Sequence, residues 1–461
     1  KPSSAASDVY KRQKWRCVGG DFSWANDMPR SVHRALGGAA RAAAGSGAQE
    51  RGAAPAASAP FHMRESFLFP PVTPTWYIGH MHRAMRSLPS LLARHPPPLV
   101  VEVRDARLPL TSINPHFEEV LQSAPSAGQR VALENGELVD GWVARRLIVY
   151  TKRDLVDSGT AGPVRRALEE HTHGQRVMFV DTRRPSDVRR VYNWACERAT
   201  QLSKAAASAA SMGGPGSRHR SPRLSGAARH TPTPETGVRL LVVGMPNVGK
   251  SALLNALRFA GTGRGRAAST HPHPGHTRKV TGTVRITPAP PSLAQLDAAG
   301  QVDMKQLVAE YAQRGPAIYV YDTPGIMVPY LGPDATEGPE RALKLGIIGC
   351  IKQSLFDPET LVDYLLYRMN QRYAAALETA ARRGAAPPPP PPYAALLRGA
   401  PPTDDCRTFL QAVAEVAPGA RQRGGAPNLA LAAEYVLDLF RKGRLGPQEL
   451  DLSGRPPAQA Y

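Results

Sequence analysis

Apolar residues follow one pattern in the first two thirds of the chain and another at its end. Short continuous apolar runs lie at residues 97–104, 146–150, 176–180, 238–243 and 317–321, and each is followed by a polar loop. Such runs are typical of strands buried in a parallel sheet. Beyond residue 340 the apolar residues recur at helical spacing, as in Leu343, Ile347 and Ile351. The pattern therefore predicts an α/β domain followed by an all-helical domain.

The remaining predicted elements are assigned from period and turn signals. A further strand is predicted at 279–286, and helices are predicted at 83–94, 118–123, 185–199, 304–312, 340–352, 358–373, 409–416 and 429–440. Pro89 is expected to break or kink the first helix, and Gly443 to end the last one. Residues 114–117 are predicted to be loop. We predict an α/β domain at 63–335, with a flexible basic linker at 201–236, and a helical domain at 336–461.

Charge and composition narrow the choice of partners. The 461 residues carry a net charge of +20, which suits a polyanionic partner such as RNA. Residues 1–62 are rich in Ala, Ser, Gly and Arg, which predicts an organellar transit peptide or a disordered basic leader. The four cysteines form no CxxC pair and indicate neither a zinc site nor a disulfide framework. No apolar stretch reaches the length of about 20 residues that a membrane span requires.

The strongest motif is GMPNVGKS at residues 244–251, between a predicted strand and a predicted helix. This is the context of a phosphate-binding loop, in which glycines let backbone N–H groups face the phosphates at a helix N-terminus. We expect Lys250 to reach the β- and γ-phosphates and the Ser251 hydroxyl to bind Mg²⁺. The predicted nucleotide-binding residues of this loop are Asn247, Val248, Gly249, Lys250, Ser251 and Ala252.

Two further loops end predicted strands. TKRD at 151–154 places a carboxylate, Asp154, where it can accept hydrogen bonds from guanine N1–H and N2–H₂, which adenine lacks. The stem of Lys152 can lie over the base, and Thr151 and Arg153 complete this loop. DTPG at 322–325 offers Asp322 for water-mediated Mg²⁺ binding and a Gly325 N–H for the γ-phosphate.

Three weaker features flank these loops. Thr182 is either a contact to the base carbonyl or part of an ordinary turn. Thr277 is a loop hydroxyl that can complete the Mg²⁺ shell, whereas the histidines beside it lack carboxylate or cysteine neighbours and do not predict a metal site. Asp105 and Arg107 are interpreted as loop polar groups near a ligand or RNA.

The order of the motifs is unusual. The guanine-reading TKRD precedes GMPNVGKS and DTPG, whereas it follows them in most proteins of this class. All parts are present but rotated along the chain, which predicts a circular permutation joined through the 201–236 linker. The DTPG loop would then lead directly into the helical domain, and loss of the γ-phosphate could move that domain.

On these motifs, together with Gly79-His-Met81, residues 105–110 (DARLPL) and Pro274-Gly-His-Thr277, the chain resembles the circularly permuted ribosome-biogenesis GTPase A (YlqF-like) family over residues 63–461, particularly its mitochondrial ribosome-associated branch. The resemblance implies a GTPase that assists maturation of the large ribosomal subunit and contacts rRNA through its helical domain. It also implies that His80 positions the attacking water and that Asn247 binds K⁺. Thr151 departs from the asparagine usual in this family, which puts guanine affinity in doubt.

The expected function is therefore a ribosome-stimulated GTP hydrolase of the mitochondrial matrix. Its expected cofactors are GTP and Mg²⁺, with K⁺ as a further candidate. Its expected partners are rRNA and proteins of the large subunit, on which it acts as a monomer. Alternatives left open are a chloroplast location, contact with the inner-membrane surface, an rRNA-binding placeholder with little turnover, and an ATPase or metabolic kinase. The placeholder arises because Ile326, an aliphatic residue, follows DTPG where a water-orienting glutamine could stand.

Overall fold

The structure is a computed structural model that describes residues 63–70, 79–93, 98–124, 127–132, 136–212, 237–265, 283–288, 315–328, 331–332, 337–421 and 425–451. At residues 79–80 and 205–212 it describes the backbone alone. The predicted leader at 1–62, the predicted helix at 304–312 and Thr277 lie outside these ranges.

A six-stranded sheet in the order β5-β4-β1-β6-β8-β7 forms the centre of the α/β part. Its strands are β1 (Leu99–Asp105), β4 (Arg146–Thr151), β5 (Arg176–Phe179), β6 (Val238–Gly244), β7 (Val284–Arg285) and β8 (Ile318–Asp322). All neighbours pair in parallel except β7, which is an antiparallel edge strand. β1 and β6 are buried along their whole lengths, as continuous apolar runs predict.

Helices cover both faces of this sheet. α7 (Pro185–Met212) and α8 (Lys250–Thr262) pack on one face, where Val101, Val103 and Val242 join their core. α3 (Gly79–Leu92), α4 (Pro115–Gln122) and α6 (Ala161–His171) pack on the other face in two smaller clusters. A short hairpin, β2 (Arg130–Ala132) and β3 (Leu138–Asp140), and the single turn α5 (Gly141–Ala144) lie between α4 and β4 in the chain.

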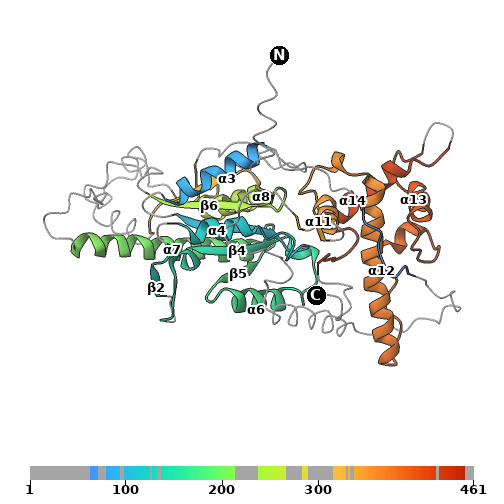
Figure 1. Cartoon of the computed structure of the whole chain (residues 1–461), viewed down its shortest axis with the longest axis horizontal. Coiled ribbons are helices and arrows are strands. Elements are labelled where there is room, and N and C mark those ends of the chain that lie inside the picture. The colour runs from blue at the N-terminus through green and yellow to red at the C-terminus, as the bar shows by residue number, and fades with distance from the viewer. Residues whose placement is uncertain are drawn as a thin grey trace, which may run out of the picture.

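The helical part consists of α11 (Glu337–Ile347), α12 (Pro358–Arg382), α13 (Cys406–Ala414) and α14 (Leu429–Arg441). Figure 1 shows α12, α13 and α14 beyond one end of the sheet, with α11 between them and the α/β part. Fold class is thus as predicted: a mostly parallel α/β domain followed by helices. Gly443 takes a positive φ of 73° just after α14, which confirms it as the residue that ends this helix.

Several predicted boundaries were wrong. α4 starts at Pro115, not at 118, because Asn114 caps it by accepting from the His116 N–H and proline suits the first helical turn. α7 runs to Met212, so the first twelve positions assigned to the linker (201–212) are helical; their alanine content favours a helix. Pro89 does not end α3, which continues to Leu92. β7 is confined to Val284–Arg285 within the strand predicted at 279–286.

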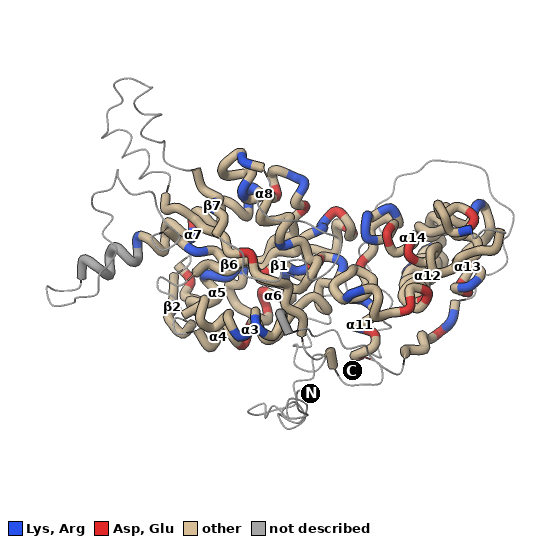
Figure 2. Tube along the Cα trace, turned by 90° about the horizontal axis from the view of Figure 1, so that it is seen from above, with Lys and Arg blue, Asp and Glu red and all other residues tan. Residues whose placement is uncertain are grey.

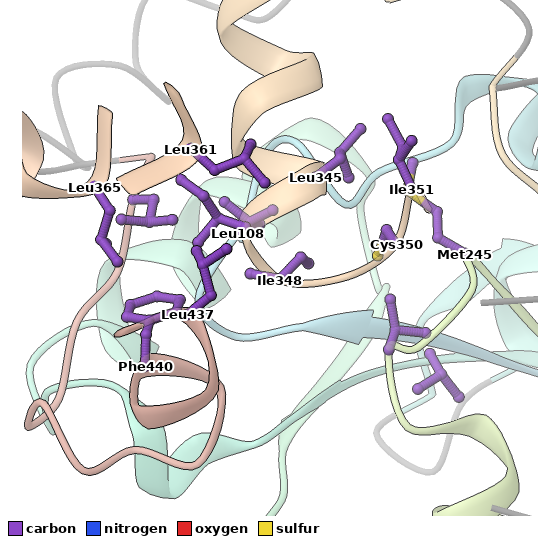
Figure 3. Packing of buried hydrophobic residues seen from close by; sticks show 14 of the residues in the cluster. Leu108, Met245, Leu345, Ile348, Cys350, Ile351, Leu361, Leu365, Leu437 and Phe440 are labelled. Atoms are coloured by element: carbon purple, nitrogen blue, oxygen red, sulfur yellow. The ribbon is translucent and has the colours of Figure 1, made fainter. Parts of the chain in front are cut away.

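One apolar cluster joins the two parts. Figure 3 shows residues from the turn after β6, from α11 and the loop that follows it, and from α12 and α14 packed into one mass: Met245, Leu345, Ile348, Cys350, Ile351, Leu361, Leu365, Leu437 and Phe440. Leu108, from the loop after β1, lies within it. Because each of these residues is at most a few per cent exposed, the junction is a continuous core.

Polar contacts fasten this junction at its rim. The Asp451 carboxylate accepts from the backbone N–H groups of Leu110 and Thr111, both at 2.8 Å, and from the Thr111 hydroxyl at 2.6 Å. Lys344 of α11 lies 3.2 Å from the same carboxylate. Asp451 is 6% exposed, so one buried carboxylate connects the last described residue, α11 and the loop after β1.

Arg441, the last residue of α14, forms hydrogen bonds across the same junction. Its guanidinium donates to the carbonyls of Ile347 (2.7 Å) and Gly346 (2.9 Å) and to Oε1 of Gln353 (2.9 Å). The first two are among the last carbonyls of α11, which have no partner within the helix. Arg441 is therefore engaged within the fold.

Replacing Arg441 with alanine is expected to lower the free energy of unfolding by about 2 kcal/mol, because it removes three charge-assisted hydrogen bonds at the junction. Lys442→Ala is the matched control. Lys442 is largely exposed and pairs only with Asp438 one turn away, so its loss is expected to cost less than about 0.5 kcal/mol. Urea unfolding measures both values, and equal losses in the two variants would contradict the role given to Arg441.

Candidate nucleotide-binding site

The loops predicted to bind nucleotide all lie at one edge of the sheet. The parallel strands β1, β4, β5, β6 and β8 end at Asp105, Thr151, Phe179, Gly244 and Asp322 respectively. The carboxyl ends of parallel strands are where open α/β sheets bind ligands. The structure therefore brings TKRD, the turn after β5, GMPNVGKS and DTPG together, although TKRD lies almost a hundred residues before the phosphate-binding loop.

The phosphate-binding loop turns from β6 into α8 with Gly249 in the left-handed region, at a φ of 97°. A side chain is strained at this φ. Lys250 begins α8 and is 7% exposed, with its ammonium donating to the Met245 carbonyl at 2.6 Å. Burial lowers the pKa of Lys250 to about 8, and the charge of Asp322 offsets part of that effect. The loop thus holds a desolvated cation at a helix N-terminus, which favours a bound anion.

Ser251 and Asp322 form a pair of oxygen donors beside this lysine. The Ser251 hydroxyl donates to Oδ2 of Asp322 at 3.2 Å, and Oδ1 of Asp322 is buried without a hydrogen-bond partner in the described part of the chain. Burial raises the pKa of Asp322. A hydroxyl beside an incompletely paired carboxylate fits the oxygen ligands that Mg²⁺ prefers, so these residues can hold the ion directly or through water.

The DTPG loop lies against the phosphate-binding loop. A side chain at Gly325 would come within 2.6 Å of the Pro246 backbone, so only glycine fits at this distance. The Ile326 N–H donates to the Gly244 carbonyl at 3.1 Å, and Asn114 donates to the Ile326 carbonyl at 3.3 Å. Ile326 is 0% exposed. The position after DTPG is therefore part of the core beneath the site.

Thr151 and Lys152 brace the phosphate-binding loop from β4. The Thr151 hydroxyl donates to the Val248 carbonyl, and the Lys152 ammonium donates to the Asn247 carbonyl at 2.8 Å. A threonine thus reaches this loop where the resemblance implies an asparagine. Asn247 in turn donates through Nδ2 to the Gly349 carbonyl at 2.7 Å, in the loop after α11.

The sequence suggested that Asp105 and Arg107 are loop polar groups near a ligand or RNA, but both side chains are buried and paired within the fold. Asp105 is 0% exposed and pairs with Arg107 at 2.8 Å and with Lys152 at 2.7 Å. Burial alone would raise the pKa of Asp105, but the charges of Arg107 and Lys152 hold it below its usual value. Asp105 therefore anchors Lys152. The parallel pairing of β1 with β4 sets Asp105 beside Thr151 and so brings it within reach of Lys152.

The residues predicted to contact the base lie in the loops after β4 and β5. The Asp154 side chain is 22% exposed, and Thr182 is half-buried in the neighbouring loop. Arg153 pairs with Asp187 of α7 at 3.5 Å. Val248 is fully buried, and Ala252 lies in the first turn of α8. His80 lies in the first turn of α3, where only the backbone is described, and Thr277 is outside the described residues.

Sequence reasoning missed the contacts made by the helical part. The Cys350 thiol donates to the Pro246 carbonyl at 2.8 Å, and burial raises the pKa of this thiol to about 12. The Gln448 N–H donates to the Leu155 carbonyl at 2.9 Å, just after the TKRD loop. Residues of the helical part therefore form hydrogen bonds both to the GMPNVGKS loop and to the residue after TKRD. No local sequence signal indicates either pair.

Fold, loops and comparison define the class of protein. Residues 239–355 match the family model described as "50S ribosome-binding GTPase". Together with the GMPNVGKS loop at the sheet edge, this match identifies the protein as a GTPase, in which TKRD precedes GMPNVGKS along the chain.

The chain is similar to curated mitochondrial GTPases. It is 29% identical over 380 residues to "Mitochondrial GTPase 1" of Schizosaccharomyces japonicus, covering 82% of this chain and 90% of the relative. It is 27% identical over 296 residues to "Mitochondrial ribosome-associated GTPase 1" of Mus musculus, covering 64% of this chain and 67% of the relative. These names support a mitochondrial location. Among the described residues, no helix combines the length and apolar character needed to cross a membrane.

Proposed function

We propose that this GTPase binds the maturing large ribosomal subunit in the mitochondrial matrix and hydrolyses GTP to leave it. The observation that carries the proposal is the attachment of the helical part to the nucleotide loops, through Gly349 to Asn247 and through Gln448 to Leu155. A helical domain fixed to these loops can respond to the state of the nucleotide. The ribosome-binding description of the matched domain and the name of the mouse relative support the choice of partner.

The residue roles in this proposal are those predicted from the sequence, and the contacts described above support several of them. Lys250 binds the β- and γ-phosphates, Asp154 reads guanine, and Thr151 and Lys152 hold the phosphate-binding loop in place. Ser251 and Asp322 hold Mg²⁺, with Thr277 completing the shell, and the ion supplies charge neutralisation at the phosphates. Thr182 contacts the base, and the Gly325 N–H contacts the γ-phosphate. Asn247 is the proposed K⁺ ligand through its Oδ1, since Nδ2 donates to Gly349.

The surface charge suits rRNA without marking a single face. Figure 2 shows Lys and Arg on both the sheet part and the helical part, with acidic residues among them on α12 and α14. The overall charge of +20 supplies a general attraction to RNA. We propose that the helical part makes the rRNA contacts.

Ile326 favours a second candidate. Its side chain is fully buried and aliphatic, so it cannot orient an attacking water. Unless His80 or a ribosomal group does so, the protein would bind rRNA as a nucleotide-gated placeholder with little turnover.

One experiment separates the two functions. GTP hydrolysis is measured with and without purified mitochondrial large subunits, in K⁺ and in Na⁺ buffer. Stimulation by subunits that is lost in Na⁺ is expected for the assembly GTPase. Tight GTP binding with flat turnover in both salts would replace it with the placeholder. A His80→Ala variant with unchanged stimulated turnover would remove His80 from the catalytic residues.

A further inference from the structure

Arg183 lies on the carboxylate that is proposed to read guanine. Its guanidinium Nη2 is 2.5 Å from Oδ2 of Asp154. Arg183 comes from the loop after β5 and Asp154 from the loop after β4, and these strands are neighbours in the sheet. The Arg183 side chain is 70% exposed.

A second carboxylate aims the guanidinium. Asp181, which is 5% exposed, accepts from the Arg183 backbone N–H at 3.0 Å, from its Nε at 3.1 Å and from its Nη2 at 3.2 Å. Hydrogen bonding to Asp181 and the charge of Asp154 raise the pKa of Arg183. The side chain is thus fastened at its base by one carboxylate and directed at the other.

The chemistry of the two donors is the same. A guanidinium presents N–H groups side by side in one plane, and guanine presents N1–H and N2–H₂ in a similar plane. Both fit a single carboxylate. Arg183 contacts Oδ2 of Asp154 through Nη2, whereas the two donors of guanine need both carboxylate oxygens, so the guanidinium has to release Oδ2 before guanine can make the expected contact.

We propose that Arg183 is an intramolecular competitor of guanine for Asp154. In the nucleotide-free protein it occupies the base-reading carboxylate; when GTP or GDP binds, it is displaced. The competition weakens the binding of guanine nucleotides and helps the empty site to persist after GDP leaves. This inference rests on the proposed role of Asp154.

The test measures the affinity of GDP for three full-chain proteins: the wild type, the Arg183→Ala variant and the Arg184→Ala variant. Exposed ion pairs contribute little, so Arg183→Ala is expected to bind GDP about two- to fivefold more tightly. Its GDP should also dissociate more slowly. Arg184 is the matched control because it has the same charge and a similar exposure, and its Nε is 3.8 Å from Asp181. Arg184→Ala is expected to leave GDP affinity unchanged.

Two further measurements decide whether the effect passes through Asp154. The difference between wild type and Arg183→Ala is expected to shrink as KCl is raised, because salt screens an exposed pair. In an Asp154→Asn background, adding Arg183→Ala is expected to leave GDP affinity nearly unchanged, since the charged partner is gone.

Each opposite result has its own meaning. Weaker GDP binding by Arg183→Ala would overturn the proposal, because the side chain would then hold the base instead of competing with it. Equal tightening by Arg183→Ala in the wild-type and Asp154→Asn backgrounds would also overturn it. An Asp154→Asn protein that still prefers GDP to XDP would overturn the guanine-reading role itself, and the competitor with it.

Discussion

Replacing Lys250 with alanine is expected to lower the rate of GTP hydrolysis by about 10²- to 10³-fold and to weaken GTP binding. Lys250 begins α8, is buried, and donates from its ammonium to the Met245 carbonyl within the turn of the phosphate-binding loop. Preorganised charge at the position where negative charge develops is the main contribution an enzyme makes to phosphoryl transfer. Single-turnover hydrolysis and GTP titration measure the two effects.

The fold is expected to survive this change. A buried ammonium whose pKa has been lowered by desolvation opposes folding, so the nucleotide-free Lys250→Ala protein should unfold at the same temperature as wild type or higher. Arg258→Ala is the matched control, since it removes one positive charge from α8 outside the loop. If both variants lose hydrolysis equally, overall charge and not the placement of Lys250 would be responsible.

The lowered pKa of Lys250 also sets a pH dependence. GTP requires the charged ammonium, so GTP affinity is expected to fall as pH rises through about 8. In an unfolded chain a lysine has a pKa of about 10.4. Between about pH 8 and 10.4 the unfolded chain binds more protons, so the stability of the nucleotide-free protein should increase over this window. Lys250→Arg stays charged and should lose both dependences; constant wild-type affinity up to about pH 9.5 would contradict the assignment.

The parts of the fold that depend on local pattern could be predicted from the sequence. The buried strands were located to within a residue or two because each combines a continuous apolar run with a polar loop at its end. α14 and Gly443 followed from helical spacing and a C-terminal glycine. The errors also have local causes: Asn114-Pro115 is a helix-capping signal that shares its residue types with loops, and the alanine-rich end of α7 has a composition that also suits a linker.

The location of the candidate site could be predicted from the sequence, but the long-range contacts that hold its loops in place could not. The strand-loop-helix context of GMPNVGKS and the strand end at TKRD each place a loop on the same sheet edge. In contrast, the contacts of Asp105 with Lys152 and of Gly349 with Asn247 join residues about 50 and 100 positions apart. Such pairs are set by the packing of whole elements, for which the local sequence carries no signal. The roles of the site residues stay predictions.

Replacing Asp154 with asparagine is expected to weaken GTP binding by about a hundredfold or more. In the proposed role the wild-type carboxylate accepts from guanine N1–H and N2–H₂, and each hydrogen bond to a charged group contributes about 1.5–3 kcal/mol. In the variant the amide would turn its N–H₂ toward the N2–H₂ of guanine, which places donor against donor. The loss should appear mainly as a faster dissociation of nucleotide.

The same substitution is expected to create a preference for xanthine nucleotides. Xanthine carries a carbonyl where guanine carries N2–H₂ and keeps N1–H, so the asparagine Nδ2 can donate to the carbonyl while Oδ1 accepts from N1–H. Competition of GTP, XTP and ATP for the full chain measures the change. Asp140→Asn, the same chemical change on β3, is the control and should keep the preference for GTP. Unchanged selectivity in Asp154→Asn would show that base recognition rests elsewhere; a switch from GTP to XTP would place it at the end of β4, ahead of the phosphate-binding loop in the chain, as the permuted order requires.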